Sequence, residues 1–270
     1  MHNAHNLRTG RIVAAAVVVT AGFWMGQARA EDLALTQGKR PSDQVVQNSL
    51  SDGAFLPFSM GTASSPHRSA AVAWGGYASD RERAVLDARV EAALLPWLML
   101  QARVSTDAEV TGLRPSLGAR IRLLRESGAR PGVALGVFYK SEGFTEPEGE
   151  IEGVLAVSTH VGRLGLLANL VYGQDPEGRE RDGEAGAGAT IGLRDRWLLG
   201  FDTRARLNLA PSSTSETGKP ALPRFDWLAG PLAMCRLGPA FLAAQVGFAM
   251  TDLDGIRLGG FGLLGLGAAL

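Results

Sequence analysis

The sequence predicts an all-β fold, an antiparallel up-and-down transmembrane β-barrel of about twelve strands. Apolar and polar residues alternate over long stretches, charges keep to one parity within them, and short and long connections alternate. Successive side chains of a strand point to opposite faces, so this alternation gives each strand one apolar and one polar face. A helix would mix the two sets around its axis.

The clearest hairpin lies at residues 184–209. Its second half places mainly apolar residues at the odd positions from 197 to 209, whereas Asp202, Arg204 and Arg206 occupy even positions. Each half exceeds the usual strand length of about 5 to 6 residues. Each also reaches the roughly 9 to 11 residues that a tilted strand needs to cross a bilayer.

Candidate strands follow one another from residue 68 onward. Their expected ranges are 68–79, 84–94, 97–106, 114–125, 131–140, 150–160, 163–173, 184–193, 196–209, 225–235, 239–250 and 256–269. Parity is less clear in the first strand and the last three. The strand at 256–269 is apolar on both parities and carries glycines on both, which suggests a wall against which other lumen side chains pack.

The connections between these strands alternate in length. Short turns are expected near 95–96, 127–130, 161–162, 194–195 and 236–238, and longer polar loops at 105–112, 141–149, 174–183 and 210–224. The first and last loops, near Asp80 and Asp252, are expected to be short outer loops. Outer-membrane barrels have short periplasmic turns and longer outer loops, so both ends of the barrel chain are expected in the periplasm.

Residues 1–30 are expected to be a signal peptide, cleaved after Ala30. Two arginines precede the apolar run 12–25, and Ala28 and Ala30 supply the small residues of a cleavage site. The alternative is a retained anchor, but the run is shorter than the roughly 20 residues of a spanning helix. Residues 31–67 are expected to form a flexible periplasmic segment because polar and chain-breaking residues dominate. A weaker alternative docks 50–60 in the barrel mouth.

Composition excludes several classes of function. Lys plus Arg and Asp plus Glu both number 27, so bulk charge does not indicate a nucleic-acid partner. Cys235 is the single cysteine, which excludes an intrachain disulfide and a cysteine zinc cage. Glutamates at 142–152 could hold Ca²⁺, but the loop lacks a dedicated calcium pattern. The G-x-G-x-x-G at 260–265 has no room for a following helix, so we expect no cofactor and no metal.

A row of charged residues shares the inward parity and is the best functional feature of the sequence. The expected lumen-lining residues are Asp87, Arg89, Glu91, Arg103, Arg120, Arg122, Glu152, Asp202, Arg204 and Arg206. Arginine-rich walls favour anions in pores. The alternative is a filled barrel in which arginines and carboxylates pair and close the pore.

Ser158 and His160 also share the inward parity, and Asn169 lies on the next strand. A serine–histidine pair with a polar orienting residue could form a lipase-like site. Residues two apart on a strand are about 6.5 to 7 Å apart, which is too far for a direct hydrogen bond. Polar residues that fill the lumen are therefore the preferred interpretation, and no catalytic residue is assigned.

From the signal sequence to the apolar last strand, these features resemble a bacterial outer-membrane β-barrel protein of the porin-like class. The resemblance covers residues 68–270 and departs from the class at Leu270, where an aromatic residue is usual. It implies a Gram-negative outer membrane, with outer-membrane lipid and the barrel-assembly machinery as partners. It implies no nucleic-acid partner, and any surface partner of the outer loops is unknown. The soluble alternatives are a periplasmic β-sandwich and a lipocalin-like calyx.

The resemblance implies a narrow channel for small, in particular anionic, solutes rather than an enzyme. The alternatives are a non-conducting structural or surface-interaction barrel and an outer-membrane lipid-modifying enzyme.

Overall fold

The structure is a computed structural model. It describes residues 55–63, 69–106, 112–127, 130–145, 148–176, 181–194, 196–209, 223–253 and 255–269. The expected signal peptide, residues 31–54 and Leu270 lie outside these ranges. Twelve strands are described: β1 (Ser69–Ala78), β2 (Arg83–Leu95), β3 (Leu98–Thr106), β4 (Leu113–Leu124), β5 (Gly132–Ser141), β6 (Gly149–Val161), β7 (Leu164–Gln174), β8 (Arg181–Arg194), β9 (Trp197–Asn208), β10 (Phe225–Leu237), β11 (Ala240–Asp252) and β12 (Ile256–Ala269).

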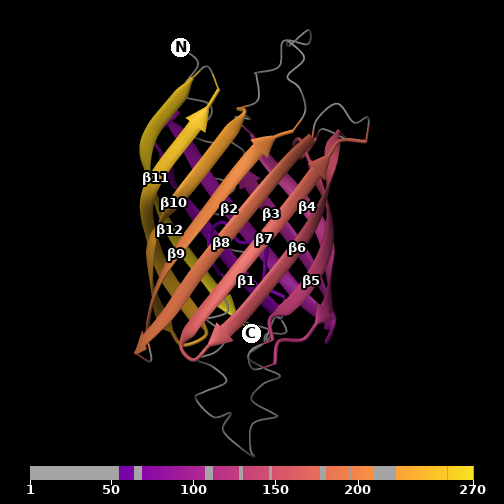
Figure 1. Cartoon of the computed structure of the whole chain (residues 1–270), viewed down its shortest axis with the longest axis vertical. Coiled ribbons are helices and arrows are strands. Elements are labelled where there is room, and N and C mark those ends of the chain that lie inside the picture. Colours follow the sequence, from indigo (N-terminus) through magenta and orange to yellow (C-terminus); the bar gives the residue numbers. More distant parts are fainter. Residues whose placement is uncertain are drawn as a thin grey trace, which may run out of the picture.

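Each strand pairs antiparallel with its sequence neighbours, and β1 pairs with β12 to close the barrel. Figure 1 shows the strands running obliquely around one cylinder. The expected fold class is therefore confirmed. The largest boundary difference is in β8, which was expected from residue 184 and begins at Arg181. The described residues contain no helix long and apolar enough to cross a membrane.

The connections divide the barrel into two ends. Short turns join β2 to β3, β6 to β7, β8 to β9 and β10 to β11, whereas longer connections join β3 to β4, β5 to β6, β7 to β8 and β9 to β10. We call these the turn end and the loop end. The strand β1 begins and β12 finishes at the turn end, which lies at the bottom of Figure 1. By the rule for outer-membrane barrels, the turn end is the periplasmic end.

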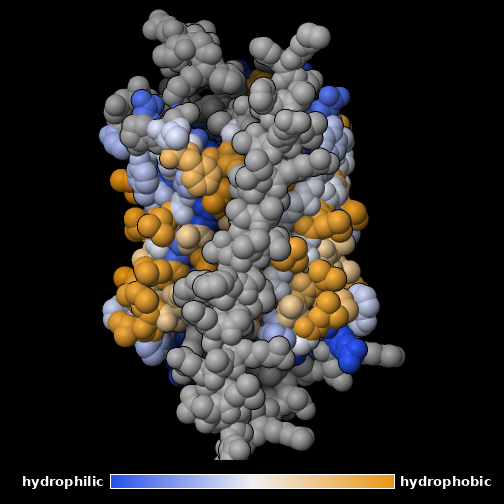
Figure 2. All heavy atoms as spheres, turned by 180° about the vertical axis from the view of Figure 1, so that it is seen from behind, coloured by the Kyte–Doolittle hydropathy of each residue, from blue (hydrophilic) through white to orange (hydrophobic). Residues whose placement is uncertain are grey.

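Apolar side chains cover the outside of the wall. Leu117, Val137 and Leu264 are 66%, 64% and 72% exposed, although each is a large hydrophobic residue within a strand. Figure 2 shows hydrophobic residues in orange along the wall and strongly hydrophilic residues in blue near its two ends. This distribution suits a wall surrounded by lipid, where a charge near the midplane would cost about 2 to 4 kcal/mol.

The inner surface has two chemically different parts. We call the inward residues of β10, β11, β12 and β1 the apolar wall, because most of them belong to one buried hydrophobic cluster. Its members include Trp74, Leu228, Met234, Phe241 and Leu263. The inward residues of β2 to β9 form the charged wall, which carries most of the buried ionisable side chains. Glycines keep the apolar wall thin, and Gly265, for example, lies beneath the ring of Trp74.

Residues 55–63, which we call the lumen segment, lie inside this barrel. Phe55, Leu56, Phe58 and Met60 are all nearly completely buried. The prediction of a flexible periplasmic segment is therefore wrong for residues 55–63. The weaker alternative, in which this stretch docks in the barrel, is closer to the structure. The physical reason is that three large apolar side chains within four residues can cover the apolar wall, which would otherwise face an aqueous lumen.

Candidate functional site

The structure places the expected lumen-lining residues on the inside of the charged wall, at different depths. Seven are buried, namely Asp87, Arg89, Glu91, Arg103, Arg120, Glu152 and Asp202. The side chains of Arg204 and Arg206 are 13% and 11% exposed, nearer the loop end. Arg122 is partly exposed near the turn end, where it lines a small cavity with Ala63 and Trp97.

Several of these charges form ion pairs in the middle of the charged wall. A guanidinium nitrogen of Arg103 lies 2.5 Å from Asp87, and one of Arg120 lies 2.9 Å from Glu91. Glu152 lies 3.1 Å from the ammonium group of Lys140. Each charge is thus taken out of water together with a partner, which offsets part of the cost of its burial.

A second group of ion pairs lies nearer the loop end. Arg83 and Arg204 share the carboxylate of Asp226, at 2.6 and 2.8 Å. Arg206 donates from Nε to Asp182 at 2.6 Å. Parity analysis identified Arg204 and Arg206 but missed Asp226, because β10 carries few charges and its alternation is weak.

The charged wall also donates hydrogen bonds to carbonyl oxygens of the lumen segment. Arg89 donates to the Ser59 carbonyl and, at 3.0 Å, to the Leu56 carbonyl. Arg120 donates to the Met60 carbonyl at 2.7 Å. From the apolar wall, the indole of Trp74 donates to the Phe55 carbonyl at 2.9 Å. These buried carbonyls therefore have partners although they belong to no strand ladder.

Backbone N–H groups of the segment are held by other side chains of the charged wall. Asp202 accepts from the Phe58 N–H at 2.9 Å, and Ser158 accepts from the Ala63 N–H at 3.2 Å. Asn169 accepts from the Met60 N–H at 2.9 Å and donates to the Gly61 carbonyl at 3.1 Å. Asp202 was expected among the charged lumen-lining residues and Ser158 among the polar residues that fill the lumen, but their bonds to the backbone of the segment could not be read from parity.

Two glycines let the segment approach the wall. Gly61 has φ +112°, a left-handed conformation that side chains rarely adopt, and a Cβ there would meet the guanidinium of Arg120. Gly188 on β8 leaves space for the Leu56 side chain, which a Cβ would strike. The missing Cβ atoms therefore leave room for the Arg120 guanidinium against the segment and for the Leu56 side chain against β8.

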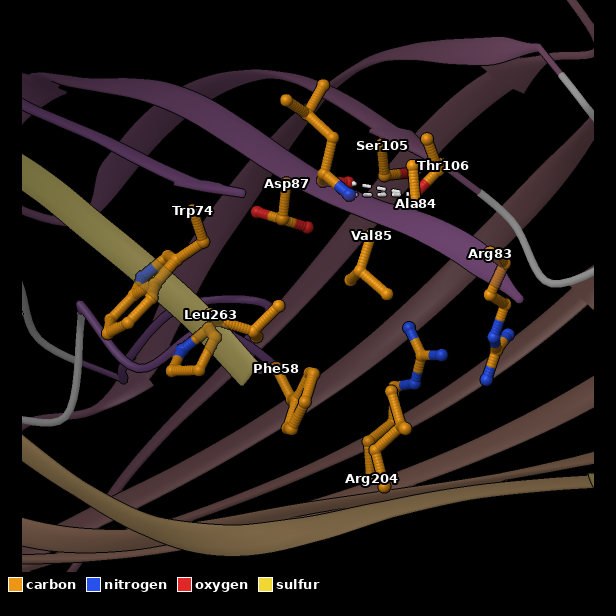
Figure 3. Close-up of a pocket in the computed structure, with 13 residues that line it drawn as sticks. Phe58, Trp74, Arg83, Ala84, Val85, Asp87, Ser105, Thr106, Arg204 and Leu263 are labelled. Atoms are coloured by element: carbon orange, nitrogen blue, oxygen red, sulfur yellow. Dashed lines mark hydrogen bonds between the residues drawn. The ribbon is translucent and has the colours of Figure 1, made fainter. Parts of the chain in front are cut away.

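The aromatic side chains of the segment pack against the apolar wall. The rings of Phe55 and Phe241 lie 4.8 Å apart, and those of Phe58 and Phe261 lie 5.8 Å apart. The guanidinium of Arg204 lies 5.5 Å from the Phe58 ring centroid. Figure 3 shows this junction, with Phe58 between Leu263 and Arg204. One side chain thus contacts both kinds of wall.

The space left in the lumen around the segment is small. One cavity lies between Phe58, Trp74 and Val85 (Figure 3), and a second between Met60, Arg103 and Glu184. Each has room for about one or two water molecules. Neither of these two cavities beside the described part of the segment is large enough for a solute much bigger than water.

The residues considered for catalysis are engaged elsewhere. The Ser158 hydroxyl holds the lumen segment, as does Asn169, and the ring of His160 lies 2.9 Å from Glu126. The structure thus does not bring the serine, histidine and asparagine together as a hydrolytic site. In the ranges that the structure covers, no group of His, Cys, Asp and Glu side chains could hold a metal ion.

Comparison with known proteins relates the chain to others through its fold. No protein-family model matches the sequence, and no curated protein matches it. The KdgM porin, solved in complex with disordered oligogalacturonate, superposes with a TM-score of 0.53 and 8% identity, over 74% of this chain and 99% of that one. The NanC porin gives 0.52 and 11%, over 74% and 100%.

LpxR from Salmonella typhimurium gives a TM-score of 0.46 with 8% identity, over 75% and 100% of the two chains, too low a score to bear on function. Identities at this level relate folds and not activities. The closed twelve-stranded barrel and its likeness to the two porins show that this chain has the fold of the porin-like outer-membrane β-barrels.

Proposed function

We propose that the protein is an outer-membrane channel for small solutes that the lumen segment closes. One observation supports a closure that can be removed. Among the described residues, the backbone of the segment bonds to lumen side chains and to itself, and not to a strand ladder. The segment can therefore leave without breaking any pairing between strands of the wall. The porin-like fold supports conduction once it has left.

We further propose that the open channel prefers small anions. Arg89, Arg103 and Arg120 lie at the depth of the segment, and all three direct guanidinium donors at its atoms. If the segment leaves, these donors face the solute. Arginine side chains lining a pore favour anions. The carboxylates of Asp87 and Glu91 remain paired with Arg103 and Arg120, which limits their attraction for cations.

A non-conducting structural barrel is the second candidate. The observation in its favour is the apolar wall, which is hydrophobic over four adjacent strands and is covered by Phe55, Leu56 and Phe58. Exposing this surface to water would cost about 25 cal/mol for each Å². A segment that never leaves would make the barrel a rigid scaffold for its outer loops.

Conductance in planar lipid bilayers separates the two candidates. The wild-type protein should open rarely, whereas Gly61→Val should conduct in discrete steps. A branched residue at Gly61 is strained by the left-handed φ and collides with Arg120, so it displaces the segment. Anion preference should appear as the sign of the reversal potential in a salt gradient, and Arg89→Gln in the Gly61→Val background should reduce it.

Gly162→Val is the matched control. Gly162 also has a positive φ, of 62°, but lies in the β6–β7 turn with nothing near its Cβ position. This variant carries a comparable backbone strain without any contact to the lumen segment, so it should open as rarely as the wild type. If Gly61→Val folds, as judged by heat-modifiable migration on gels, and remains silent in every salt, the protein is a structural barrel and not a channel.

A further inference from the structure

The lumen offers hydrogen-bond donors to backbone carbonyl groups of the lumen segment. Trp74, Arg89 and Arg120, on β1, β2 and β4, donate to the carbonyl oxygens of Phe55, Leu56, Ser59 and Met60. These are side-chain donors directed at backbone acceptors, and they recognise no side chain of the segment. These three side chains therefore bind backbone carbonyl groups, which every peptide carries.

Strands β6, β7 and β9 offer acceptors to backbone N–H groups of the segment. Ser158, Asn169 and Asp202, on β6, β7 and β9, accept from the N–H groups of Ala63, Met60 and Phe58. Asn169 in addition donates to the Gly61 carbonyl, so its amide pairs with the backbone in both directions. Donors from β1, β2 and β4 and acceptors from β6, β7 and β9 together bind both the carbonyl and the N–H groups of a peptide backbone.

Pockets for side chains accompany these backbone contacts. Phe55 and Phe58 enter the apolar wall, where they meet Phe241 and Phe261. Met60 enters a separate small cluster with Phe138, Val154 and Val171. Apolar side chains at these positions are thus accepted alongside the backbone. A small inorganic anion would use the arginines and leave the acceptors and both apolar pockets empty.

We propose that this lumen is a binding site for short apolar peptides, and that the lumen segment is its intramolecular stand-in. The inference rests on the proposed channel in that an external peptide enters when the segment leaves. A peptide would replace the segment, with its carbonyls on Arg89 and Arg120 and its N–H groups on Asn169 and Asp202.

Binding of a synthetic peptide tests the inference separately from conductance. The probe is a fluorescently labelled copy of residues 55–63, Phe-Leu-Pro-Phe-Ser-Met-Gly-Thr-Ala, titrated by anisotropy against full-length Gly61→Val protein in detergent. We expect saturable binding to this variant and at least about tenfold weaker binding to the wild type, whose own segment competes. A scrambled peptide should bind less tightly than the copy.

A peptide with one methylated backbone nitrogen gives a sharper probe. Methylation at the methionine removes the N–H group that donates to Asn169. We expect the loss of this single hydrogen bond to weaken binding about tenfold. Asn169→Leu in the Gly61→Val background should weaken the unmodified peptide and leave no further effect of methylation. This double-mutant logic separates recognition of the backbone from partition of an apolar peptide into the micelle.

The possible outcomes distinguish the two proposals. If Gly61→Val conducts but does not bind the peptide, or binds the scrambled and methylated peptides equally well, the peptide site is refuted and the channel stands. If the peptide binds with the expected pattern but no variant conducts, the site stands and the channel fails. Should Gly61→Val not fold, Phe55→Asp displaces the segment through a carboxylate placed beside Phe241, and the same titrations decide.

Discussion

The apolar wall and the charged wall belong to one sheet with one alternation, yet their interiors differ in kind. The charged wall is held by pairs such as Arg120 with Glu91, whereas the apolar wall is held by packing around Trp74. The lumen segment touches both, since Arg89 and Arg120 bind its backbone and the apolar wall receives its aromatic rings. A polar backbone with apolar side chains is therefore the kind of chain that this lumen can hold.

The two walls should lose stability for different reasons when their side chains are substituted. A buried ion pair contributes little net stability, but removing one partner leaves a charge buried alone. An apolar wall tolerates small reductions in side-chain volume, and its destabilisation grows with the size of the cavity that a truncated side chain leaves. Substitutions of similar size should consequently have unequal effects in the two walls.

The largest effect is expected for Arg120→Ala in the charged wall. The variant leaves Glu91 buried without its partner at 2.9 Å and frees the Met60 carbonyl. We expect a loss of about 3 to 5 kcal/mol in the free energy of unfolding, measured by urea titration in lipid vesicles. Arg122→Ala, in a partly exposed residue of the same strand, should change it by less than about 1 kcal/mol. Equal losses in both variants would contradict a specific buried pair.

An intermediate effect is expected for Trp74→Phe in the apolar wall. An aromatic ring remains, but the hydrogen bond from the indole to the Phe55 carbonyl is lost. We expect a loss of about 1 to 2 kcal/mol, together with more frequent openings in bilayer recordings. Trp97→Phe is the control, because Trp97 is 49% exposed while Trp74 is 1% exposed. A change in opening with Trp97→Phe would show that the effect does not arise at the lumen segment.

The smallest effects should differ in sign between the walls. Gln245 lies in the apolar wall, where its Nε2 donates to the Gly230 carbonyl and its buried Oε1 has no partner among the described residues. Gln245→Leu should thus be neutral or stabilising by up to about 1 kcal/mol. Gln101 likewise has a buried Nε2 without a partner in the described part of the chain, but its Oε1 accepts from the charged guanidinium of Arg120 at 3.1 Å, so Gln101→Leu should destabilise by up to about 1 kcal/mol. Calorimetry on the detergent-solubilised variants measures the change in stability. If both substitutions stabilise or both destabilise the protein, the two walls do not differ in this respect.

The charged wall could be predicted from the sequence because charge is informative about direction. A row such as Asp87, Arg89 and Glu91 cannot face lipid, so parity alone assigns its direction. Parity could not show which atoms these groups bind. The contacts of Arg89 and Asp202 with the lumen segment depend on a stretch far away in the sequence.

The apolar wall and the lumen segment could not be predicted in the same way. In the strand at 256–269 both parities are apolar, so neither face is marked as inward. In residues 50–60 the polar and chain-breaking residues indicate a loop, so the sequence does not show that Phe55, Leu56 and Phe58 cover an apolar surface. The two features could have been connected, because an inner surface that is apolar on the strand at 256–269 can be covered by apolar residues from 50–60 of the same chain.

The join between β1 and β12 has a consequence for how the molecule is made. The lumen segment precedes β1 and is therefore synthesised before any strand, yet the side chains that bind it come from strands as late as β9, β11 and β12. No complete cradle exists until the last strand reaches the first. The last strand must therefore pair with the first either around a segment that is already in place or before the segment enters from the turn end, and in both orders the site that holds the segment is completed only when the barrel closes.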